Sequence, residues 1–464
     1  MLDVLIKGGQ VVNATSTVTA DVGVADGKIA FLARPGAISA PAEHVIEAAG
    51  YLVLPGGVDP HVHFDLRLSD SVTSQSSAAG SRAAAHGGTT TFIDFAWQDG
   101  DQSLVEAIEL KRARLREEKP SIDYGLHAMM TGAVSNRVID ELEDAMAAGV
   151  SSFKLFTTFS AGSAFGAWQM DDGRIWGVMQ SVARHGGLVL VHCEDDCIIN
   201  FCSRALNDQG LTDARHIAKA RPNLAEEAAT KRMLLLAERS GCPLYVVHLS
   251  SREAMNAVRG ARSNGQQAFG EVLHNYLVFT SDDYERPNGI VFNNYPPLKS
   301  AADRQALWEG VEDGTVDAVA SDDCAIPLAA KLAGKRIDDL AGGHNGVETR
   351  LMVLFSEGVA KRRISVNRFV EITSANPAKL FGLFPRKGVL APGSDADLVL
   401  WDPMATRTIR QAGLHSACDY SIWDGFECTG MPVLTMAGGQ VLVDHDKWVG
   451  PEGKGQFAGA NAIA

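Results

Sequence analysis

From Leu52 onward, short apolar runs alternate with helical stretches, and this alternation limits the possible folds more than any other feature of the chain. Such alternation is typical of βα units that build a parallel sheet. Strand-type runs recur eight times before the chain reaches residue 322. They are Leu52–Val58, Thr89–Phe95, Tyr124–Met130, Ser152–Phe156, Leu188–Cys193, Leu244–Leu249, Ala268–Val272 and Val316–Ser321.

Helical patterns fill the intervals between these runs, for example at Leu104–Glu117, Arg137–Ala148 and Asn223–Ser240. The last two are followed directly by glycine, which commonly ends a helix. Eight strands with intervening helices, over slightly more than the roughly 250 residues usual for that fold, predict a (β/α)8 TIM barrel. An open doubly wound sheet is the alternative. No G-x-G-x-x-G motif follows any of the strands, so a dinucleotide site is weakly supported.

Short β signals flank the predicted barrel on both sides. Residues 1–51 read as strands joined by turns, with Asp26-Gly27 as a hairpin signal. After a helical stretch at Ser365–Phe381, β signals return between residues 385 and 449. Neither segment alone can bury an apolar face, so we expect both to form one small discontinuous β-sandwich domain. The barrel would span residues 52–384, and residues 450–464 would form a loosely held C-terminal arm.

The overall charge restricts the partners that the protein can have. The chain carries 42 basic and 56 acidic residues, a formal charge of -14, which disfavours nucleic acid and anionic membranes. No apolar run approaches the roughly 20 residues needed to span a bilayer, and no signal peptide is evident, so we expect a cytoplasmic protein. Seven cysteines fit a reducing compartment, and Cys193, Cys197 and Cys202 read as buried or helix-facing thiols.

Polar residues recur where the predicted strands end, and a barrel places its chemistry at these ends. His61 and His63 are two positions apart, so in an extended chain both imidazoles point to one side. Each such residue alone is more often a satisfied core or rim group than a metal ligand. Six at matching positions argue against coincidence and indicate a metal site. They are His61, His63, Lys154, His192, His248 and Asp322.

Several longer motifs resemble those of the amidohydrolase superfamily, and within it the hydantoinase/dihydropyrimidinase family of cyclic amidases. The resemblance covers nearly the whole chain and is carried by Pro-Gly-Gly-Val-Asp-Pro-His-Val-His (55–63), Gly-Gly-Thr-Thr-Thr-Phe-Ile-Asp (87–94), Phe-Lys-Leu-Phe (153–156), Val-His-Cys-Glu (191–194), Val-His-Leu-Ser (247–250), Pro-Pro-Leu-Lys (296–299), Ser-Asp-Asp-Cys (321–324), Asn-Pro-Ala-Lys-Leu-Phe-Gly (376–382) and Gly-Ser-Asp-Ala-Asp-Leu-Val (393–399).

This resemblance implies two divalent metal ions, usually zinc. His61, His63 and Asp322 would hold one ion, and His192 and His248 the other. Lys154 would bridge them as a carbamate, because an ammonium beside two dications is repelled whereas a carbamate is an anionic ligand. A hydroxide bridging the metals would attack the ring carbonyl of a cyclic amide or imide. Asp322 would act as the catalytic base that carries its proton to the leaving nitrogen.

The residues expected around the substrate depart from the family pattern. Phe159 stands where the family has an oxyanion-stabilising tyrosine, Tyr295 replaces the serine of Ser-Pro-Pro-Leu, and Asp323 replaces the histidine of Ser-Asp-His. One interpretation is a pocket that binds through backbone groups and tolerates such changes. We favour a ring different from plain hydantoin or dihydrouracil. Tyr295, His344 or Asn345 would supply a hydrogen bond, and Phe159 with Trp97 an apolar wall.

Other functions compatible with the fold are allantoinase, dihydroorotase and non-cyclic amide hydrolysis. For dihydroorotase, Arg67 is a weak signal because it is offset from that family's usual arginine. A non-catalytic interaction scaffold is disfavoured because such relatives typically lose metal ligands. The resemblance also implies a homo-oligomer, a tetramer or dimer, with the C-terminal arm as a candidate for subunit contacts.

Overall fold

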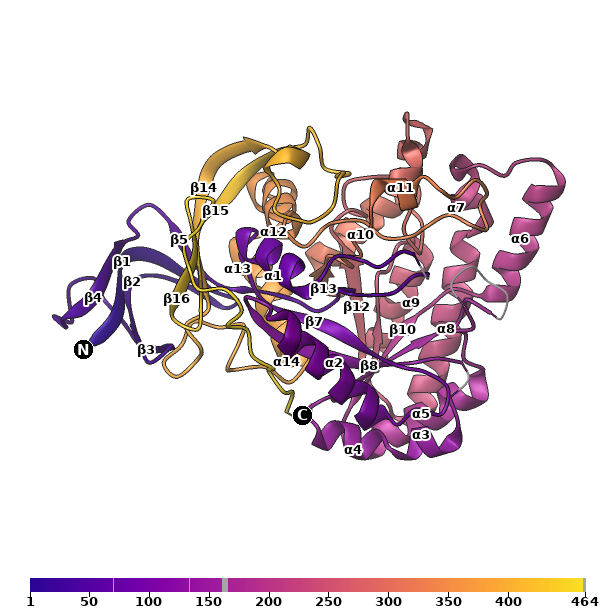
Figure 1. Cartoon of the computed structure of the whole chain (residues 1–464), viewed down its shortest axis with the longest axis horizontal. Coiled ribbons are helices and arrows are strands. Elements are labelled where there is room, and N and C mark those ends of the chain that lie inside the picture. Colours follow the sequence, from indigo (N-terminus) through magenta and orange to yellow (C-terminus); the bar gives the residue numbers. More distant parts are fainter. Residues whose placement is uncertain (70, 133, 161–165, 462–464) are drawn as a thin grey trace.

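A computed structural model describes residues 1–69, 71–132, 134–160 and 166–461. One of its two sheets has eight parallel strands that neighbour one another in chain order. This order confirms the predicted barrel (Figure 1). The strands are β6 (Gly57–Asp59), β7 (Thr89–Gln98), β8 (Asp123–Met130), β9 (Ser152–Phe156), β10 (Leu188–His192), β11 (Leu244–Val246), β12 (Ala268–Leu273) and β13 (Val316–Ala320).

The seam between the first and last barrel strands is held by a buried arginine rather than by a strand ladder. Arg350 donates hydrogen bonds to the carbonyl oxygens of Val58, in β6, and Val319, in β13, over 3.3 and 2.9 Å. It also forms an ion pair with buried Asp59, with 3.3 Å between Nε and Oδ2. Just beyond the strands, Val62 and Asp323 form a parallel bridge. These contacts make the barrel nearly closed.

Helices surround the barrel, and most predicted ones are present. Asn223–Ser240 is confirmed as α8, which ends at Gly241 in the left-handed conformation. The predicted helix at Arg137–Ala148 is divided into α3 and α4, because Glu141 leaves helical geometry and its carboxylate accepts a hydrogen bond from the Leu104 amide. The helices are α1 (Ser77–His86), α2 (Leu104–Glu118), α3 (Asn136–Asp140), α4 (Leu142–Ala147), α5 (Asp172–His185), α6 (Asp196–Asp208), α7 (Ile217–Ala220), α8 (Asn223–Ser240), α9 (Arg252–Ser263), α10 (Ala301–Asp313), α11 (Leu328–Lys331), α12 (Arg350–Leu354), α13 (Val366–Val370) and α14 (Asn376–Leu380).

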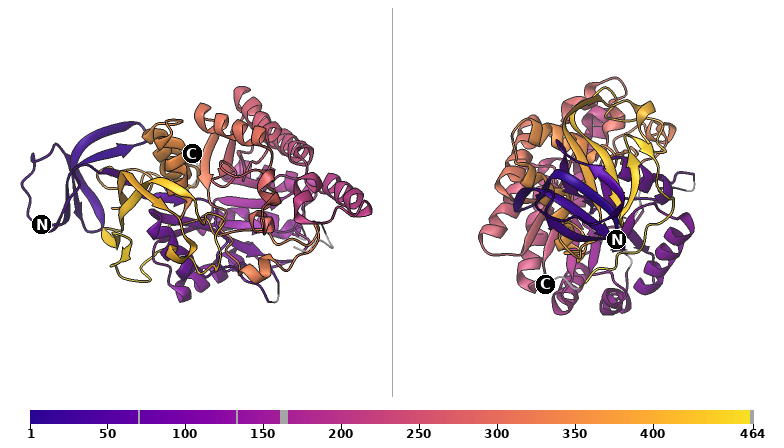
Figure 2. Two further views of the ribbon diagram at one scale, coloured as in Figure 1. Left: turned by 90° about the horizontal axis from the view of Figure 1, so that it is seen from above. Right: turned by 90° about the vertical axis from the view of Figure 1, so that its left-hand side faces the viewer.

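The two ends of the chain share a second sheet, as expected, and it lies at one end of the molecule (Figure 2). The predicted sandwich takes the form of one continuous mixed sheet in which β5 lies between β1 and β14. Its strands are β1 (Leu2–Asn13), β2 (Ser16–Ala25), β3 (Lys28–Ala33), β4 (Ala42–Glu47), β5 (Leu52–Pro55), β14 (Leu398–Thr408), β15 (Glu427–Ala437), β16 (Gln440–Asp444) and β17 (Lys447–Trp448).

The sequence predicts one continuous barrel strand at Leu52–Val58, and this prediction is wrong. Its first half is β5 of the small sheet, and only its second half is β6 of the barrel. The chain passes between the sheets at Gly56, where a Cβ atom would lie 2.0 Å from Thr90 Oγ1. Only glycine fits this close approach. The small sheet thus extends to Pro55, beyond the boundary at residue 51 expected from the sequence.

The C-terminal arm is more firmly attached than its composition predicts. Tyr124 forms two backbone hydrogen bonds with this segment. Its amide donates to Gln456 O over 3.0 Å, and its carbonyl oxygen accepts from the Ala458 amide over 2.7 Å. Farther along, the Asn461 amide donates to Gly382 O. The described part of the arm therefore lies along the start of β8 instead of extending freely.

The structure also bears on the membrane and cysteine predictions. In the part of the chain that is described, no helix combines the length and apolar character that crossing a membrane requires. All seven cysteines are free thiols, and Cys193 is buried while Cys197 and Cys202 lie on α6.

Candidate metal centre

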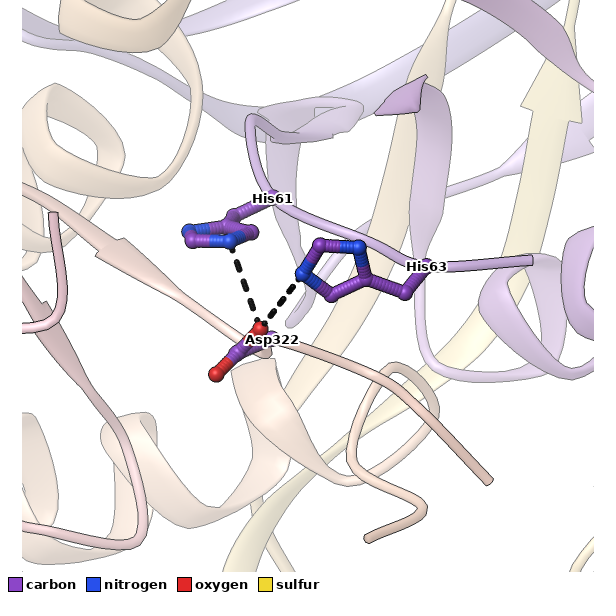
Figure 3. Close-up of side chains that lie close together, drawn as sticks. All are labelled: His61, His63 and Asp322. Atoms are coloured by element: carbon purple, nitrogen blue, oxygen red, sulfur yellow. Dashed lines mark ion pairs between the residues drawn. The ribbon is translucent and has the colours of Figure 1, made fainter. Parts of the chain in front are cut away.

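His61, His63 and Asp322 meet at the carboxyl ends of the barrel strands (Figure 3). His61 and His63 follow β6, and Asp322 follows β13, so the barrel seam brings them together. Both imidazole Nε2 atoms point at Asp322 Oδ1, over 3.3 Å from His61 and 3.1 Å from His63. Together they form a compact group of two imidazoles and a carboxylate that could hold one metal ion.

The other predicted ligands lie around the same cavity. The rings of His192 and His248 are 4.5 Å apart, and the His248 ring is 5.6 Å from that of His61. Lys154 is fully buried on β9, and burial lowers the pKa of its ammonium to about 8. The structure therefore brings all six predicted residues to one place, although His192, His248 and Lys154 are not part of the tight group around Asp322.

Two buried glutamates that the sequence interpretation missed orient the histidines. Glu271, on β12, contacts His61 Nδ1 over 2.8 Å, and Glu194 contacts His192 Nε2 over 2.8 Å. Arg221 pairs with Glu194 in turn. Carboxylates of this kind fix the tautomer of a ligating imidazole and leave the other nitrogen free for a metal. In the sequence, Glu271 is a single charged residue within the apolar run Ala268–Val272, and this position could have indicated a functional role.

The protonation states also suit metal binding. Burial lowers the pKa of His192 to about 4 and holds the pKa of His248 well below its usual range. Burial would raise the pKa of Asp322, but the imidazoles of His61 and His63 outweigh it and hold that pKa well below its usual range. Buried His61 Nε2 and His248 Nδ1 have no hydrogen-bond partner among the described residues. Neutral imidazoles at His192 and His248 and an ionised carboxylate at Asp322 fit a divalent cation.

Unusual backbone conformations direct several side chains into the centre. His248, Asp322 and Phe159 have φ angles of 38°, 50° and 68°, in the left-handed region that non-glycine residues seldom adopt. Each follows the end of a barrel strand, where the chain must turn sharply. Strained residues of this kind persist only where the surrounding structure holds them, and they cluster at functional sites.

The cavity at this centre has a volume of about 80 Å³ and suits a small ring. Phe159, Tyr295 and Trp97 line it, and their contacts with a substrate stay predictions. His344 and Asn345 are buried and are not among the residues that line the cavity, so their substrate roles stay predictions. The described lining residues are His61, His63, Leu66, Leu68, Trp97, Met129, Lys154, Phe156, Phe159, Trp168, His192, His248, Asn294, Tyr295, Asp322, Cys324, Gly342 and Gly343.

Asn294 is a further polar residue that the sequence interpretation missed. Its side-chain amide donates to Asp322 Oδ2 over 3.1 Å. The other carboxylate oxygen, Oδ1, remains directed at His61 and His63. Asn294 therefore holds the Asp322 carboxylate in one orientation.

The departure at Asp323 has a structural explanation. Its buried carboxylate accepts hydrogen bonds from the backbone amides of Gly346 and Val347, over 2.7 and 3.0 Å. It also accepts one from the Gln75 side chain. Asp323 therefore holds the loop at residues 341–347 against the barrel and points away from the metal ligands.

Lys331 joins the two segments that form one wall of the cavity. Its fully buried Nζ donates to the carbonyl oxygens of Asn293, Ala341 and Gly343. Asn293 precedes two lining residues, and Gly343 is itself in the lining. The ammonium thus fixes the distance between these segments.

Replacing Lys331 with methionine should raise KM more than it lowers kcat, because the wall loosens while the metal ligands stay in place. We also expect a lower Tm, since the carbonyls of Asn293 and Gly343 are buried and lose a donor at a cost of about 1–3 kcal/mol each. Steady-state kinetics and thermal melting would measure both effects. Lys335→Met, four residues away at an exposed position, is the matched control. An unchanged KM in Lys331→Met would rule out this positioning role.

A TIM barrel with this arrangement of imidazoles and carboxylates defines a metal-dependent hydrolase class. The model of the amidohydrolase family matches residues 52–442, and the chain belongs to this family. It is 37% identical to a D-hydantoinase from Ralstonia pickettii and to one from Geobacillus stearothermophilus, over 98% of this chain and 98% and 95% of theirs.

Solved structures agree with this assignment. A dihydropyrimidinase from Brevibacillus agri superposes with a TM-score of 0.94 at 34% identity, over 99% of both chains. An L-hydantoinase (dihydropyrimidinase) from Arthrobacter aurescens gives a TM-score of 0.91 at 32% identity, over 99% of this chain and 100% of that one. The similarity extends over both the barrel and the small sheet.

Proposed function

We propose that the protein hydrolyses the ring of a cyclic amide or imide, of the hydantoin or dihydropyrimidine type. The observation that carries this proposal is the convergence of six ligand-type side chains on one small cavity in a chain of this family. The relatives with hydantoinase and dihydropyrimidinase names match over nearly the full chain, which supports the same class of substrate.

The residues present fit two divalent metal ions, which we propose to be zinc. His61, His63 and Asp322 would hold one ion, His192 and His248 the other, and Lys154 both, after its amine has added CO2 and lost a proton to become a carbamate. A pKa of about 8 leaves part of the Lys154 population as the neutral amine that can add CO2. When bound, the ions would supply Lewis acidity to the ring carbonyl and make water a stronger acid.

Asp322 is the proposed carrier of the proton. Its carboxylate would accept a proton from the attacking water and transfer it to the ring nitrogen as the carbon–nitrogen bond breaks. Asn294 would keep the carboxylate in the orientation that both transfers need. The aromatic lining formed by Phe159, Trp97 and Trp168 would exclude bulk water from the reacting groups.

Phe159 and Tyr295 support a substrate different from plain hydantoin or dihydrouracil. The Phe159 ring lies 5.2 Å from that of His192 and cannot donate a hydrogen bond to an oxyanion. Tyr295 donates its hydroxyl hydrogen to Leu340 O over 2.8 Å, while its ring forms part of the cavity wall. We therefore propose that Tyr295 contacts the substrate mainly through its ring.

Tyr295→Phe should change kcat/KM on the best substrate by less than about threefold, because the ring remains and the hydroxyl is engaged with the backbone. Tyr295→Ala is the companion variant, and the loss of its ring should lower kcat/KM by at least about tenfold. Steady-state kinetics on both variants test the assignment. A tenfold loss in Tyr295→Phe would instead identify the hydroxyl as a polar substrate contact.

A substrate panel tests the proposed function directly. The metal-loaded protein should open at least one ring among substituted hydantoins, dihydropyrimidines and cyclic imides, with the product detected by chromatography. Both D- and L-substituted hydantoins belong in the panel, since D- and L-hydantoinases are both among the structural neighbours. Turnover confined to allantoin, dihydroorotate or linear amides would favour the corresponding alternative activity.

We further propose a cytoplasmic homo-oligomer, a dimer or tetramer, as the family resemblance implies. The described part of the arm packs on its own barrel, so it supports subunit contacts less directly than its composition suggested. Light scattering would give the mass in solution, and a monomer would contradict this proposal.

A further inference from the structure

A second group of metal-ligand side chains lies where the barrel meets the small sheet. His86 is the last residue of α1, His415 lies between β14 and β15, and Asp446 lies in the turn between β16 and β17. Helix α1 packs against β15 and β16, which places the three segments together. One possible ligand atom from each residue lies within 4.8 Å of the others. The group is separate from the catalytic residues at the carboxyl ends of the barrel strands.

His86 is the buried member of the group and has the least satisfied side chain. Its side chain is 1% exposed, and neither ring nitrogen has a hydrogen-bond partner among the described residues. Its Nδ1 lies 3.7 Å from Asp446 Oδ1, too far for a hydrogen bond. Buried polar groups are rarely left unpaired in folded proteins. A cation between the two side chains would satisfy both.

The two other members are held by neighbours in the way that metal ligands commonly are. His415 Nδ1 contacts the buried Glu348 carboxylate over 2.9 Å, which fixes the tautomer with a lone pair on Nε2. Arg407 holds Asp446 Oδ2 over 3.1 Å, and the other oxygen, Oδ1, is the one closest to His86. The two carboxylates outweigh the single arginine, so the surroundings favour a cation.

The rings of His86 and His415 must change their relative orientation before both can bind one metal ion. The rings of His86 and His415 are stacked with centroids 3.3 Å apart and an interplanar angle of 6°. A face-to-face stack is a less favourable arrangement for aromatic rings. The rings must tilt for their lone pairs to converge on one ion. A cavity of about 370 Å³, lined in part by His86, Glu348 and Asp446, provides the room.

We propose that His86, His415 and Asp446 bind one divalent transition-metal ion, with zinc as the best match to two imidazoles and a carboxylate. This ion would connect a barrel helix, the segment before β15 and a turn of the small sheet. Its role would be to stabilise the junction between the two domains. It takes no part in ring hydrolysis.

Metal counting tests the proposal with the full-length protein. After dialysis against zinc buffer and removal of free ion, His86→Gln should hold one zinc per chain fewer than the wild type. His445→Gln is the matched control, because His445 is next to Asp446 but 74% exposed and outside the group. Asp446→Asn, at a half-exposed position, gives the same comparison if His86→Gln fails to fold. Equal zinc contents in the wild type and in a folded variant would overturn the proposal.

The same comparison in a Lys154→Ala background separates this site from the catalytic centre. Adding His86→Gln to this background should again remove one zinc per chain. Added zinc should raise the Tm of Lys154→Ala but not that of the Lys154→Ala, His86→Gln double variant. Identical zinc contents and melting curves in these two proteins would reject the third site, whatever the catalytic centre binds.

Discussion

Asp322→Asn is expected to fold normally and to lose about 10²–10⁴-fold in kcat, the usual range for loss of a positioned acid or base. The amide matches the carboxylate in shape but cannot accept and return a proton at neutral pH. Asp322 lies against His61 and His63, so the side chain that holds the metal would also move the proton. Kinetics at a fixed, measured metal content would separate the two roles.

Asp323→Asn is the control, and it should lose stability while keeping most of its activity. Asp323 is equally buried and adjacent in sequence, but its carboxylate binds backbone amides of the 341–347 loop. We therefore expect a lower Tm with a loss in kcat of less than about tenfold, because an amide replaces only part of its hydrogen bonding. Near-wild-type turnover in Asp322→Asn would remove Asp322 from the proton-transfer step.

Strand-end residues were the part of the site that the sequence could predict. A parallel barrel brings the carboxyl ends of its strands to one face, so residues far apart in sequence, such as His61 and His248, can be placed together from strand order alone. The alternation of strands and helices also predicted the barrel. It did not divide Leu52–Val58 into β5 and β6, although Pro55, Gly56 and Gly57 interrupt the apolar residues there, because the point of passage between the sheets depends on a close contact of Gly56 with Thr90.

Residues that support the site from behind could not be found in this way. Lys331 acts through three backbone carbonyls, and Asn294 through Asp322, so their roles depend on tertiary contacts that leave no periodic pattern. The loop containing His344 and Asn345 shows the opposite error, in which the sequence predicts substrate contacts that the cavity lining does not include. Its polar residues appeared to be available for substrate, but an irregular loop has no regular face, and these two side chains are buried outside the cavity lining.

The proposed metal bridge predicts the effect of removing Lys154. This lysine is fully buried among Phe95 and Phe156, with its Nζ 5.6 and 5.2 Å from their ring centres, and no carboxylate forms a close ion pair with it among the described residues. An ammonium at this position would be poorly solvated and would repel any cation held by the histidines. A carbamate would remove both difficulties, because it would replace the positive charge with an anionic ligand that faces the ligands of both proposed ions.

Lys154→Ala should therefore lose most of its catalytic metal and at least about 10³-fold in kcat/KM, since both proposed ions lose a shared ligand. Acetate or propionate should restore part of both, because a small carboxylate can occupy the space of the missing side chain and supply the two oxygens. Lys331→Ala is the matched control: it also removes a fully buried lysine, but from the cavity wall, so short acids should not rescue it. Full catalytic-metal occupancy in Lys154→Ala without added acid would show that the ions do not need this bridge. Rescue of both Lys154→Ala and Lys331→Ala would show that short acids stabilise the protein in general and do not replace a metal ligand.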